Sequence, residues 1–334
     1  DHIITWSLCG TRVAFESQKS YIVIVDQRRG PFRNNENNNN ENGWLAHGEE
    51  YITDLKFAPD GSFLVSIGFD GSLRLWDNVT GNYEQLQQWN MAEEITEEFN
   101  GEPKVSISAC SKYIAASVGS CVFFNDVGNG GKSIKSLLSL APNNAIQNIV
   151  FSSTGNNHAV LICVWTSTGM HIKVWRPYLD DDDEDRVVTL WRQKYKTRDF
   201  REFTFSNDNT MIAMHDMLRS GAMLYSGALW SIDLNQKCLT QESEFQSKCR
   251  AGKAAMITVY FTADDKYIVC NSPMGPTFWS IAEQKFSDDS TYVLNCSNTT
   301  KHNRRAFHFS PNNRQLVVGD SSTQTLYITS YFMK

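Results

Sequence analysis

The feature of this sequence that most constrains its fold is an internal repeat. An apolar run ending in an aromatic residue or Ile is followed by turn residues, a β-rich run, a second turn and another β-rich run. The clearest copy covers residues 52–77, and the pattern recurs about every 50 residues, close to the spacing of four-stranded propeller units with some loop insertion. The first runs of the seven copies end at Trp6, Phe57, Ile107, Phe151, Phe205, Phe261 and Phe309.

The repeated runs have the character of β-strands. They are too short for helices and rich in β-branched and aromatic residues, and several are apolar at consecutive positions, which indicates sheets covered on both faces. The gaps leave no room for crossover helices, which excludes a doubly wound α/β fold, whereas two tandem β-sandwiches remain an alternative. The sequence therefore predicts an all-β chain with one domain over residues 1–334. We expect a seven-bladed β-propeller of four-stranded antiparallel blades.

Three segments stand apart from the regular repeat. Only residues 329–334 follow the third run of the last copy, so we expect the last blade to lack its outer strand within this chain. An open sheet edge is a place where a partner's strand can add. Residues 34–42 are an Asn-rich loop and residues 180–185 an acidic loop. The acidic run is typical of a solvated loop, with docking of a basic partner as the alternative.

Composition narrows the class of protein. The 334 residues are 41% apolar and carry 31 Lys and Arg against 37 Asp and Glu, a net charge of −6, which excludes a disordered chain. No apolar run approaches the roughly 20 residues of a membrane helix, so no membrane partner is expected. The eight cysteines are scattered singly, which is typical of reduced thiols in an intracellular protein, nuclear or cytoplasmic. The chain begins at Asp1 without a signal segment, and we interpret it as a fragment or a processed chain.

The second copy of the repeat resembles a WD repeat. His47 precedes its first run, Ser66 lies in the second, Asp70 in the following turn and Trp76 in the third, and Asp77 follows the Trp. The resemblance implies a hydrogen-bonded structural tetrad in which Asp70 accepts from His47 and Ser66 links His47 to the Trp76 indole. A buried indole N–H needs such a partner.

The other copies keep this signature only in part. Val25-Asp26 and Ile232-Asp233 keep the Asp without the Trp, and Trp175-Arg176 keeps the Trp without the Asp. By this alignment the sixth and seventh copies keep neither. The resemblance covers the layout of the whole chain and the complete tetrad of one repeat.

Motifs for catalysis or cofactor binding are missing from the sequence. Residues 128–133 look like a phosphate-binding loop but lack its first Gly, because position 126 is Asp. No Gly-x-Ser-x-Gly or His-Glu-x-x-His pattern occurs, and the seven His residues are dispersed. We therefore expect no enzyme activity, no cofactor and no metal.

Partner binding is the remaining function. In WD-repeat propellers, the segments leading into first strands and the turns between second and third strands gather on one face, at the mouth of the central channel. Arg beside aromatic and apolar residues is the usual composition of binding hot spots. The second-to-third turns offer Phe69, Trp165, Met217, Leu218 and Met274. The leading segments offer a lopsided basic crown that includes Lys104, Arg198, Arg201, Arg304 and Arg305.

The sequence thus favours a non-catalytic interaction scaffold within a larger protein or complex, which docks a protein or peptide at the channel mouth. A basic crown predicts an acidic or phosphorylated partner. Two alternatives remain: nucleic-acid or chromatin binding through a basic face, which the net charge of −6 disfavours, and an enzyme with its active site at the channel mouth.

Overall fold

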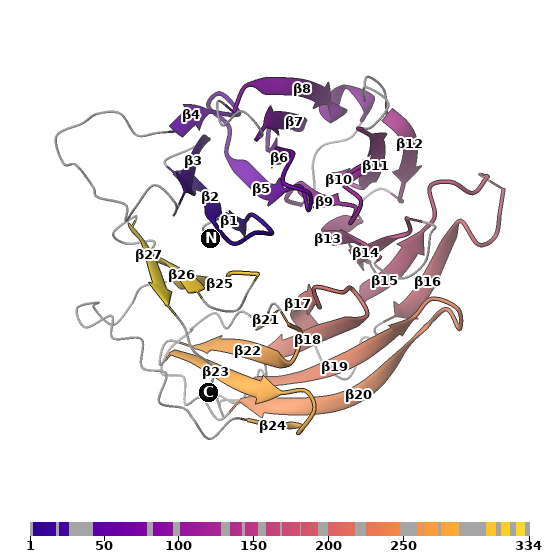
Figure 1. Cartoon of the computed structure of the whole chain (residues 1–334). Coiled ribbons are helices and arrows are strands. Elements are labelled where there is room, and N and C mark those ends of the chain that lie inside the picture. Colours follow the sequence, from indigo (N-terminus) through magenta and orange to yellow (C-terminus); the bar gives the residue numbers. More distant parts are fainter. Residues whose placement is uncertain are drawn as a thin grey trace. The chain divides into compact units, whose positions relative to one another are not determined.

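The chain forms an all-β structure, seen here in a computed structural model (Figure 1). Its strands are short, and one short 3-10 helix, η2 (Met91–Glu94), lies among the described residues. The chain divides into two compact units, residues 2–189 and residues 190–334, so the single domain over 1–334 stays a prediction. The structure describes residues 3–17, 20–26, 43–78, 83–95, 101–127, 134–141, 144–152, 158–167, 169–180, 182–192, 200–217, 225–247, 259–262, 264–272, 275–286, 305–311, 315–320 and 325–330.

The unit of residues 2–189 contains three complete antiparallel sheets and most of a fourth. The first sheet is formed by β1 (Ile4–Trp6), β2 (Arg12–Ser17), β3 (Tyr21–Asp26) and β4 (Gly43–Leu45). The second is formed by β5 (Ile52–Phe57), β6 (Phe63–Gly68), β7 (Ser72–Asp77) and β8 (Gln85–Asn90). The third is formed by β9 (Lys104–Ile107), β10 (Tyr113–Val118), β11 (Cys121–Asp126) and β12 (Ile134–Ser139). The fourth is formed by β13 (Ala145–Phe151), β14 (Val160–Thr166), β15 (Gly169–Trp175) and β16 (Val187–Arg192).

The unit of residues 190–334 contains two further four-stranded sheets and one of three strands. The first is formed by β17 (Phe200–Phe205), β18 (Met211–Met217), β19 (Tyr225–Asp233) and β20 (Cys238–Ser247). The second is formed by β21 (Val259–Phe261), β22 (Tyr267–Ser272), β23 (Gly275–Ser280) and β24 (Lys285–Phe286). The three-stranded sheet is formed by β25 (Arg305–Phe309), β26 (Gln315–Asp320) and β27 (Thr325–Ser330).

The predicted number of blades was wrong. The structure holds six four-stranded propeller blades rather than seven, and β25–β27 form a sheet of three strands among the described residues. The physical reason is that the repeat count identifies first strands, whereas a blade requires four strands paired in order. A first strand ending at Phe309 is present, but it does not by itself make a complete blade.

Burial explains why the second strands are apolar at consecutive positions. All six residues of β6 are buried, whereas β8, the outer strand of the same sheet, is mostly exposed. Within each unit, neighbouring sheets pack against each other and cover each other's faces. One apolar cluster joins the sheets β1–β4 and β5–β8 through residues such as Ile22 and Leu64, and another joins β5–β8 and β9–β12 through residues such as Leu75 and Phe123.

Directional hydrogen bonds also connect adjacent sheets in the unit of residues 2–189. In each case a backbone N–H at one sheet's first strand donates to a side chain of the sheet before it. The three bonds join Ile52 N to Glu16 Oε1 (3.2 Å), Val105 N to Asp54 Oδ2 (3.1 Å) and Phe151 N to Ser106 Oγ (3.0 Å). Successive sheets are therefore held together by polar bonds as well as by apolar packing.

Antiparallel pairing gives every sheet two ends that carry different loops. At one of these ends the first strand begins and the second strand finishes. We call this end the start edge; it is an end of the strands that carries loops, not an outer strand of the sheet. In the sheet β5–β8 the start edge carries Tyr51 and the turn of residues 68–71. The opposite edge of the same sheet carries residues 58–62 and Asn78.

Candidate interaction site

Hydrogen bonds connect His47 and Asp70, at the start edge of the sheet β5–β8, with Ser66 in β6 and Trp76 in β7. His47 Nδ1 lies 2.9 Å from Asp70 Oδ1, and His47 Nε2 lies 2.8 Å from Ser66 Oγ. Trp76 Nε1 donates to Ser66 Oγ at 2.9 Å. The side chains of His47, Ser66 and Trp76 are buried, so each bond satisfies a polar group that water does not reach.

The turn between β6 and β7 holds Asp70 in place. Gly71 N donates to Gly68 O at 3.0 Å, and Gly71 has a φ of +68°, which favours glycine. A Cβ atom on Gly68 would lie 2.7 Å from His47 Nδ1 and 3.0 Å from the backbone O of Tyr51. Glycine at 68 therefore allows the turn to pack directly against the His47 ring.

A second layer of contacts supports Asp70. Ser72 Oγ donates to Asp70 Oδ2 at 2.7 Å, and Arg74 forms an ion pair with the same oxygen at 3.0 Å. Burial by itself raises the pKa of Asp70, but the hydrogen bond and charge of His47 and the hydrogen bonds from Ser72 outweigh it, so the pKa lies below its ordinary value. The Arg74 side chain also donates to Ser72 Oγ and to the backbone O of Ala46.

Strand pairing identifies the positions equivalent to Trp76 in four of the other six sheets. Trp76 pairs with Leu64, the residue that also pairs with the end of the first strand, and Ser66 lies two residues further along. By the same register the equivalents of Trp76 are Asn125, Trp175, Trp230 and Trp279. The equivalents of Ser66 are, in the same order, Ala116, Ile162, Met214 and Cys270.

Where the Ser66 equivalent is Ala116, Ile162 or Met214, the polar group at the Trp76 position has no hydrogen-bond partner within the described residues. This is true of the indole N–H of Trp175, of the indole N–H of Trp230, and of both amide atoms of Asn125. The comparison also corrects the sequence alignment. Trp230, rather than Ile232, holds the Trp position in β19, and Trp279 holds it in β23, where the sequence analysis placed no Trp.

Two exposed aromatic side chains lie at the start edge, close in the chain to residues of the tetrad. Phe69, in the turn between β6 and β7, is 40% exposed, and Tyr51, which directly precedes β5, is 48% exposed. Phe69 N donates to Tyr51 O at 3.0 Å, which holds the two backbones side by side. The sequence analysis selected Phe69 and missed Tyr51, because no pattern in a single sequence separates an exposed Tyr before a strand from a buried one.

Among the described residues, several acidic side chains lie near this pair. Glu49 and Glu50 directly precede Tyr51 and are exposed. Glu93, in η2, is also exposed, and Met91 N in the same element donates to the backbone O of Gly71 at 3.0 Å. We define the Tyr51–Phe69 surface as Glu49, Glu50, Tyr51 and Phe69.

The remaining predicted partner residues are only partly described. Trp165 lies near the end of β14, next to the turn that follows this strand, and is half-buried. Lys104 begins β9 and pairs with Glu102 at 2.8 Å rather than standing as an isolated positive charge. Arg201, Met217 and Arg305 lie in β17, β18 and β25, and nothing is described of their side chains. Arg198, Leu218, Met274, Arg304 and the Asn-rich loop of residues 34–42 lie outside the described residues.

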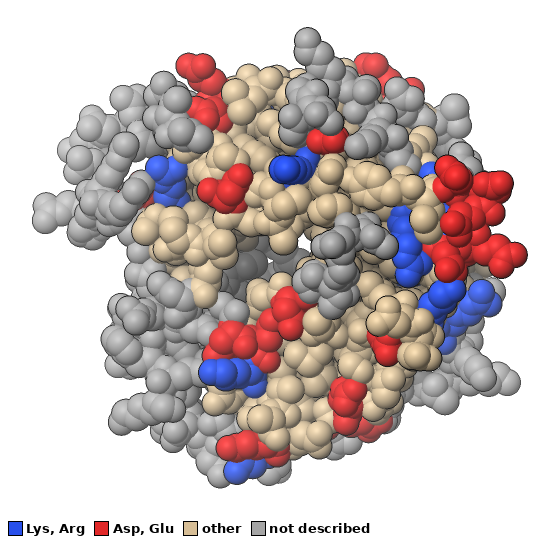
Figure 2. Space-filling view, turned by 45° about the vertical axis from the view of Figure 1, so that its right-hand side comes forward, with Lys and Arg blue, Asp and Glu red and all other residues tan. Residues whose placement is uncertain are grey.

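The acidic loop connects β15 and β16. Figure 2 shows a group of acidic side chains over this connection, and Asp180, Asp182, Asp183 and Glu184 are exposed. The loop is folded back on itself, since Asp183 N donates to Asp180 O and Arg176 Nη1 donates to Asp185 O at 2.7 Å. Its role in docking a basic partner stays a prediction.

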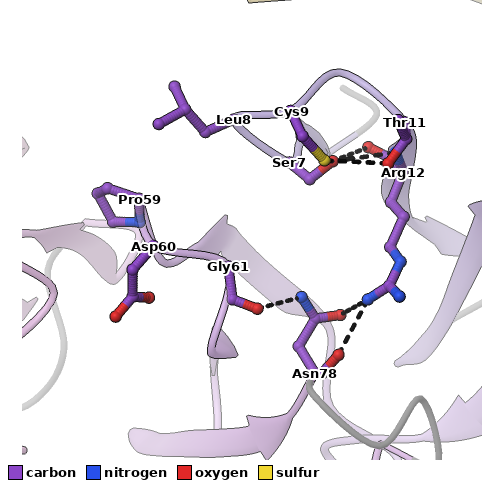
Figure 3. Close-up of a pocket in the computed structure, with 9 residues that line it drawn as sticks. All are labelled: Ser7, Leu8, Cys9, Thr11, Arg12, Pro59, Asp60, Gly61 and Asn78. Carbon is purple, nitrogen blue, oxygen red and sulfur yellow. Dashed lines mark hydrogen bonds between the residues drawn. The ribbon is translucent and has the colours of Figure 1, made fainter.

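A pocket of about 530 Å³ lies at the opposite edge, between the sheets β1–β4 and β5–β8 (Figure 3). Arg12 spans it by donating to Asn78 O (2.9 Å) and Asn78 Oδ1 (2.8 Å), while its Nε bonds Asp26. Burial raises the pKa of the exposed Cys9 thiol, but hydrogen bonds with Ser7 and Thr11 outweigh it and the pKa is lowered. The pocket is lined by Ser7, Leu8, Cys9, Thr11, Arg12, Pro59, Asp60, Gly61 and Asn78.

Two other features are absent from the described residues. No group of three or more His, Cys, Asp or Glu side chains among them could hold a metal ion. Among the same residues, no helix is both long enough and apolar enough to cross a membrane.

Comparison with known families agrees with this geometry. Residues 42–77, which include the whole tetrad, match the family described as WD domain, G-beta repeat. Together, the matched repeat and the four-stranded propeller sheets support a WD-repeat propeller family for this chain, with no particular member indicated. A search of curated proteins found no match to the chain. Propellers of the WD-repeat class generally act as scaffolds that bind proteins or peptides, and they are typically not enzymes.

Proposed function

We propose that this chain is a non-catalytic scaffold that docks a protein or peptide partner on the start edge of the sheet β5–β8, within a larger protein or complex. The observation that carries the proposal is the exposed pair Tyr51 and Phe69 held over the buried tetrad. Aromatic side chains on a rigid support are typical hot spots, because a bound segment loses its freedom while the receptor loses little.

Comparison with the next sheet supports a role in binding rather than in folding. The turn between β10 and β11, equivalent to the turn that carries Phe69, contains Gly119 and Ser120. The third sheet therefore reverses the chain with a shorter turn that carries no aromatic residue. An exposed Phe at position 69 is not needed for the turn, and binding gives a reason for its presence.

The test is a peptide-display selection on the purified chain with an unbiased library. We expect selected peptides to bind Phe69→Ala and Tyr51→Ala about tenfold more weakly than the unchanged chain, as for truncated hot-spot residues. The matched control is Leu8→Ala, which removes a 63% exposed side chain at the opposite edge and should leave binding unchanged. Equal loss in all three variants, or no loss at Phe69 and Tyr51, would contradict the proposal.

The chemistry of the partner is a separate question. An acidic or phosphorylated partner was predicted from the leading segments, and that prediction depends on Arg198, Arg304 and neighbours outside the described residues. Strand addition beside β27 likewise stays a prediction. Both are distinguishable outcomes of the experiments, since neither requires Phe69.

A further inference from the structure

We infer that the segment docked at the Tyr51–Phe69 surface is basic, presenting Lys or Arg beside an apolar side chain. This inference rests on the proposed function and specifies the partner's chemistry. The described residues at this surface combine two aromatic rings with carboxylates, and that combination fits a cation carried on a partly apolar segment.

The charge balance at the surface is the first argument. Glu49 and Glu50 are exposed, and within the described residues neither forms an ion pair. Arg74, the cation that supports Asp70 in the neighbouring turn, is already engaged. Its Nε donates to Ser72, its Nη1 to Ala46 O and its Nη2 to Asp70. Within the described part of the chain, no cation is therefore paired with the carboxylate of Glu49 or Glu50, and these groups can attract a positive partner.

The aromatic rings are the second argument. A Lys ammonium or Arg guanidinium over the face of an exposed Tyr or Phe gains from the ring quadrupole, and nearby carboxylates add to that attraction. Phe69 also offers apolar area that a charged group alone would not use. A segment with alternating cationic and apolar side chains satisfies both features, whereas an acidic segment would face Glu49 and Glu50 with like charge.

The position of the rings relative to the tetrad is the third argument. Asp70 directly follows Phe69 in the chain, and its carboxylate bonds His47 and Ser72. These bonds fix the turn that carries Phe69. Tyr51 O accepts the Phe69 backbone N–H, so the two residues are held as one unit. The surface is thus preorganised, which reduces the entropy lost when a partner segment binds.

The experiment measures binding of the full chain to two immobilised libraries of random peptides. One library is enriched in Lys and Arg, and the other is enriched in Asp and Glu. We expect the basic library to be retained. Retained peptides should bind Phe69→Ala about tenfold more weakly, and the double variant Glu49→Gln with Glu50→Gln about two- to fivefold more weakly. Binding should also weaken when salt is raised from about 0.1 M to about 1 M, since the Debye length falls to about 3 Å. Glu84→Gln, which changes a carboxylate at the opposite edge, is the matched charge control.

Each outcome separates the inference from the proposed function. Retention of acidic peptides that depend on Phe69 would overturn the basic-partner inference while leaving the docking site intact. Retention of basic peptides that ignore Phe69 and Tyr51 would overturn both. Retention of neither library, with peptides still selected by the unbiased library through Phe69, would overturn the inference alone.

Discussion

The hydroxyl of Ser66 serves two buried partners at once, the imidazole of His47 and the indole of Trp76. Replacing it with Ala would leave a buried indole N–H unpaired, as observed for Trp175 in the sheet where Ile162 holds the position of Ser66. A lost partner of this kind typically costs about 1–3 kcal/mol. The tetrad should therefore contribute measurably to the stability of the sheet β5–β8.

We expect Ser66→Ala to lower the free energy of unfolding by about 1–3 kcal/mol, measured by urea denaturation. Combining it with Trp76→Phe, which removes the indole N–H, should cost less than the sum of the two single changes, because the unpaired donor is gone. A Ser66→Ala variant as stable as the unchanged chain, or strict additivity in the double variant, would contradict this account.

Asn125 is a buried polar side chain whose replacement should stabilise the chain rather than destabilise it. It is fully buried, and neither amide atom has a hydrogen-bond partner in the described part of the chain. Replacing an unpaired buried amide with an apolar side chain of similar size removes that penalty. We expect Asn125→Leu to raise the free energy of unfolding by about 1–3 kcal/mol. Chemical denaturation measures this directly, and a loss of stability would show that the amide has a role not accounted for here.

At the scale of one element, the β6–β7 turn is the tightest point of the site. We expect Gly68→Ala to destabilise the chain by about 1–3 kcal/mol, because its Cβ would overlap His47 and crowd the Tyr51 carbonyl. The variant should also bind selected peptides more weakly, since the turn carries Phe69. Gly61→Ala is a useful comparison: its φ of +75° makes Ala strained, but no atom lies within 4 Å of the new Cβ.

If Gly68→Ala changed stability no more than Gly61→Ala does, steric conflict with His47 would not be the cause. Thermal unfolding together with peptide binding distinguishes the two cases. A change in stability without a change in binding would mean that the turn relaxes without moving Phe69.

The lowered pKa of Asp70 has a consequence for pH. Its folded pKa lies below the ordinary value, so the unfolded chain binds the proton more readily, and ionised Asp70 adds stability at all pH values above its ordinary pKa. That contribution should disappear as the pH falls below about 4. We expect Asp70→Asn to be less stable than the unchanged chain at neutral pH, with the difference shrinking in acid. Urea titrations at several pH values test this, and a pH-independent difference would contradict it.

The register of third strands shows where sequence reasoning succeeds and where it fails. The residues that end the first runs were found correctly, because apolar runs bounded by turn residues are a strong local signal. The equivalent of Trp76 in β19 was misplaced by two residues, since Asp233 resembles Asp77 in sequence. Pairing with Ile212, which only the structure reveals, assigns Trp230 to that position.

At the scale of the whole molecule, the class of fold was predictable but the number of complete blades was not. Counting repeats detects copies of the pattern formed by the first three strands. Whether a fourth strand pairs depends on outer-strand residues, which show little regular pattern in the sequence. The Tyr51–Phe69 surface was half predictable for a similar reason. Phe69 lies in a recognisable turn, whereas Tyr51 and its neighbouring carboxylates gain meaning only when the fold places them beside it.

The charge of the whole chain separates protein docking from nucleic-acid binding. With a net charge of −6, the chain lacks a general electrostatic footprint for DNA or RNA. We expect no shift of a random-sequence duplex or single strand in a mobility assay at about 0.15 M salt. A shift that weakens steeply with added salt would instead favour the nucleic-acid alternative.

The hydrogen bonds from Ile52 to Glu16, from Val105 to Asp54 and from Phe151 to Ser106 reach only from one sheet to the next. A substitution that breaks one of these bonds affects the two sheets that it joins and leaves more distant sheets intact. Evolution can therefore alter a single sheet, including its exposed turn, without redesigning the others. That independence is consistent with a chain in which the sheet β5–β8 carries the full tetrad and neighbouring sheets carry only parts of it.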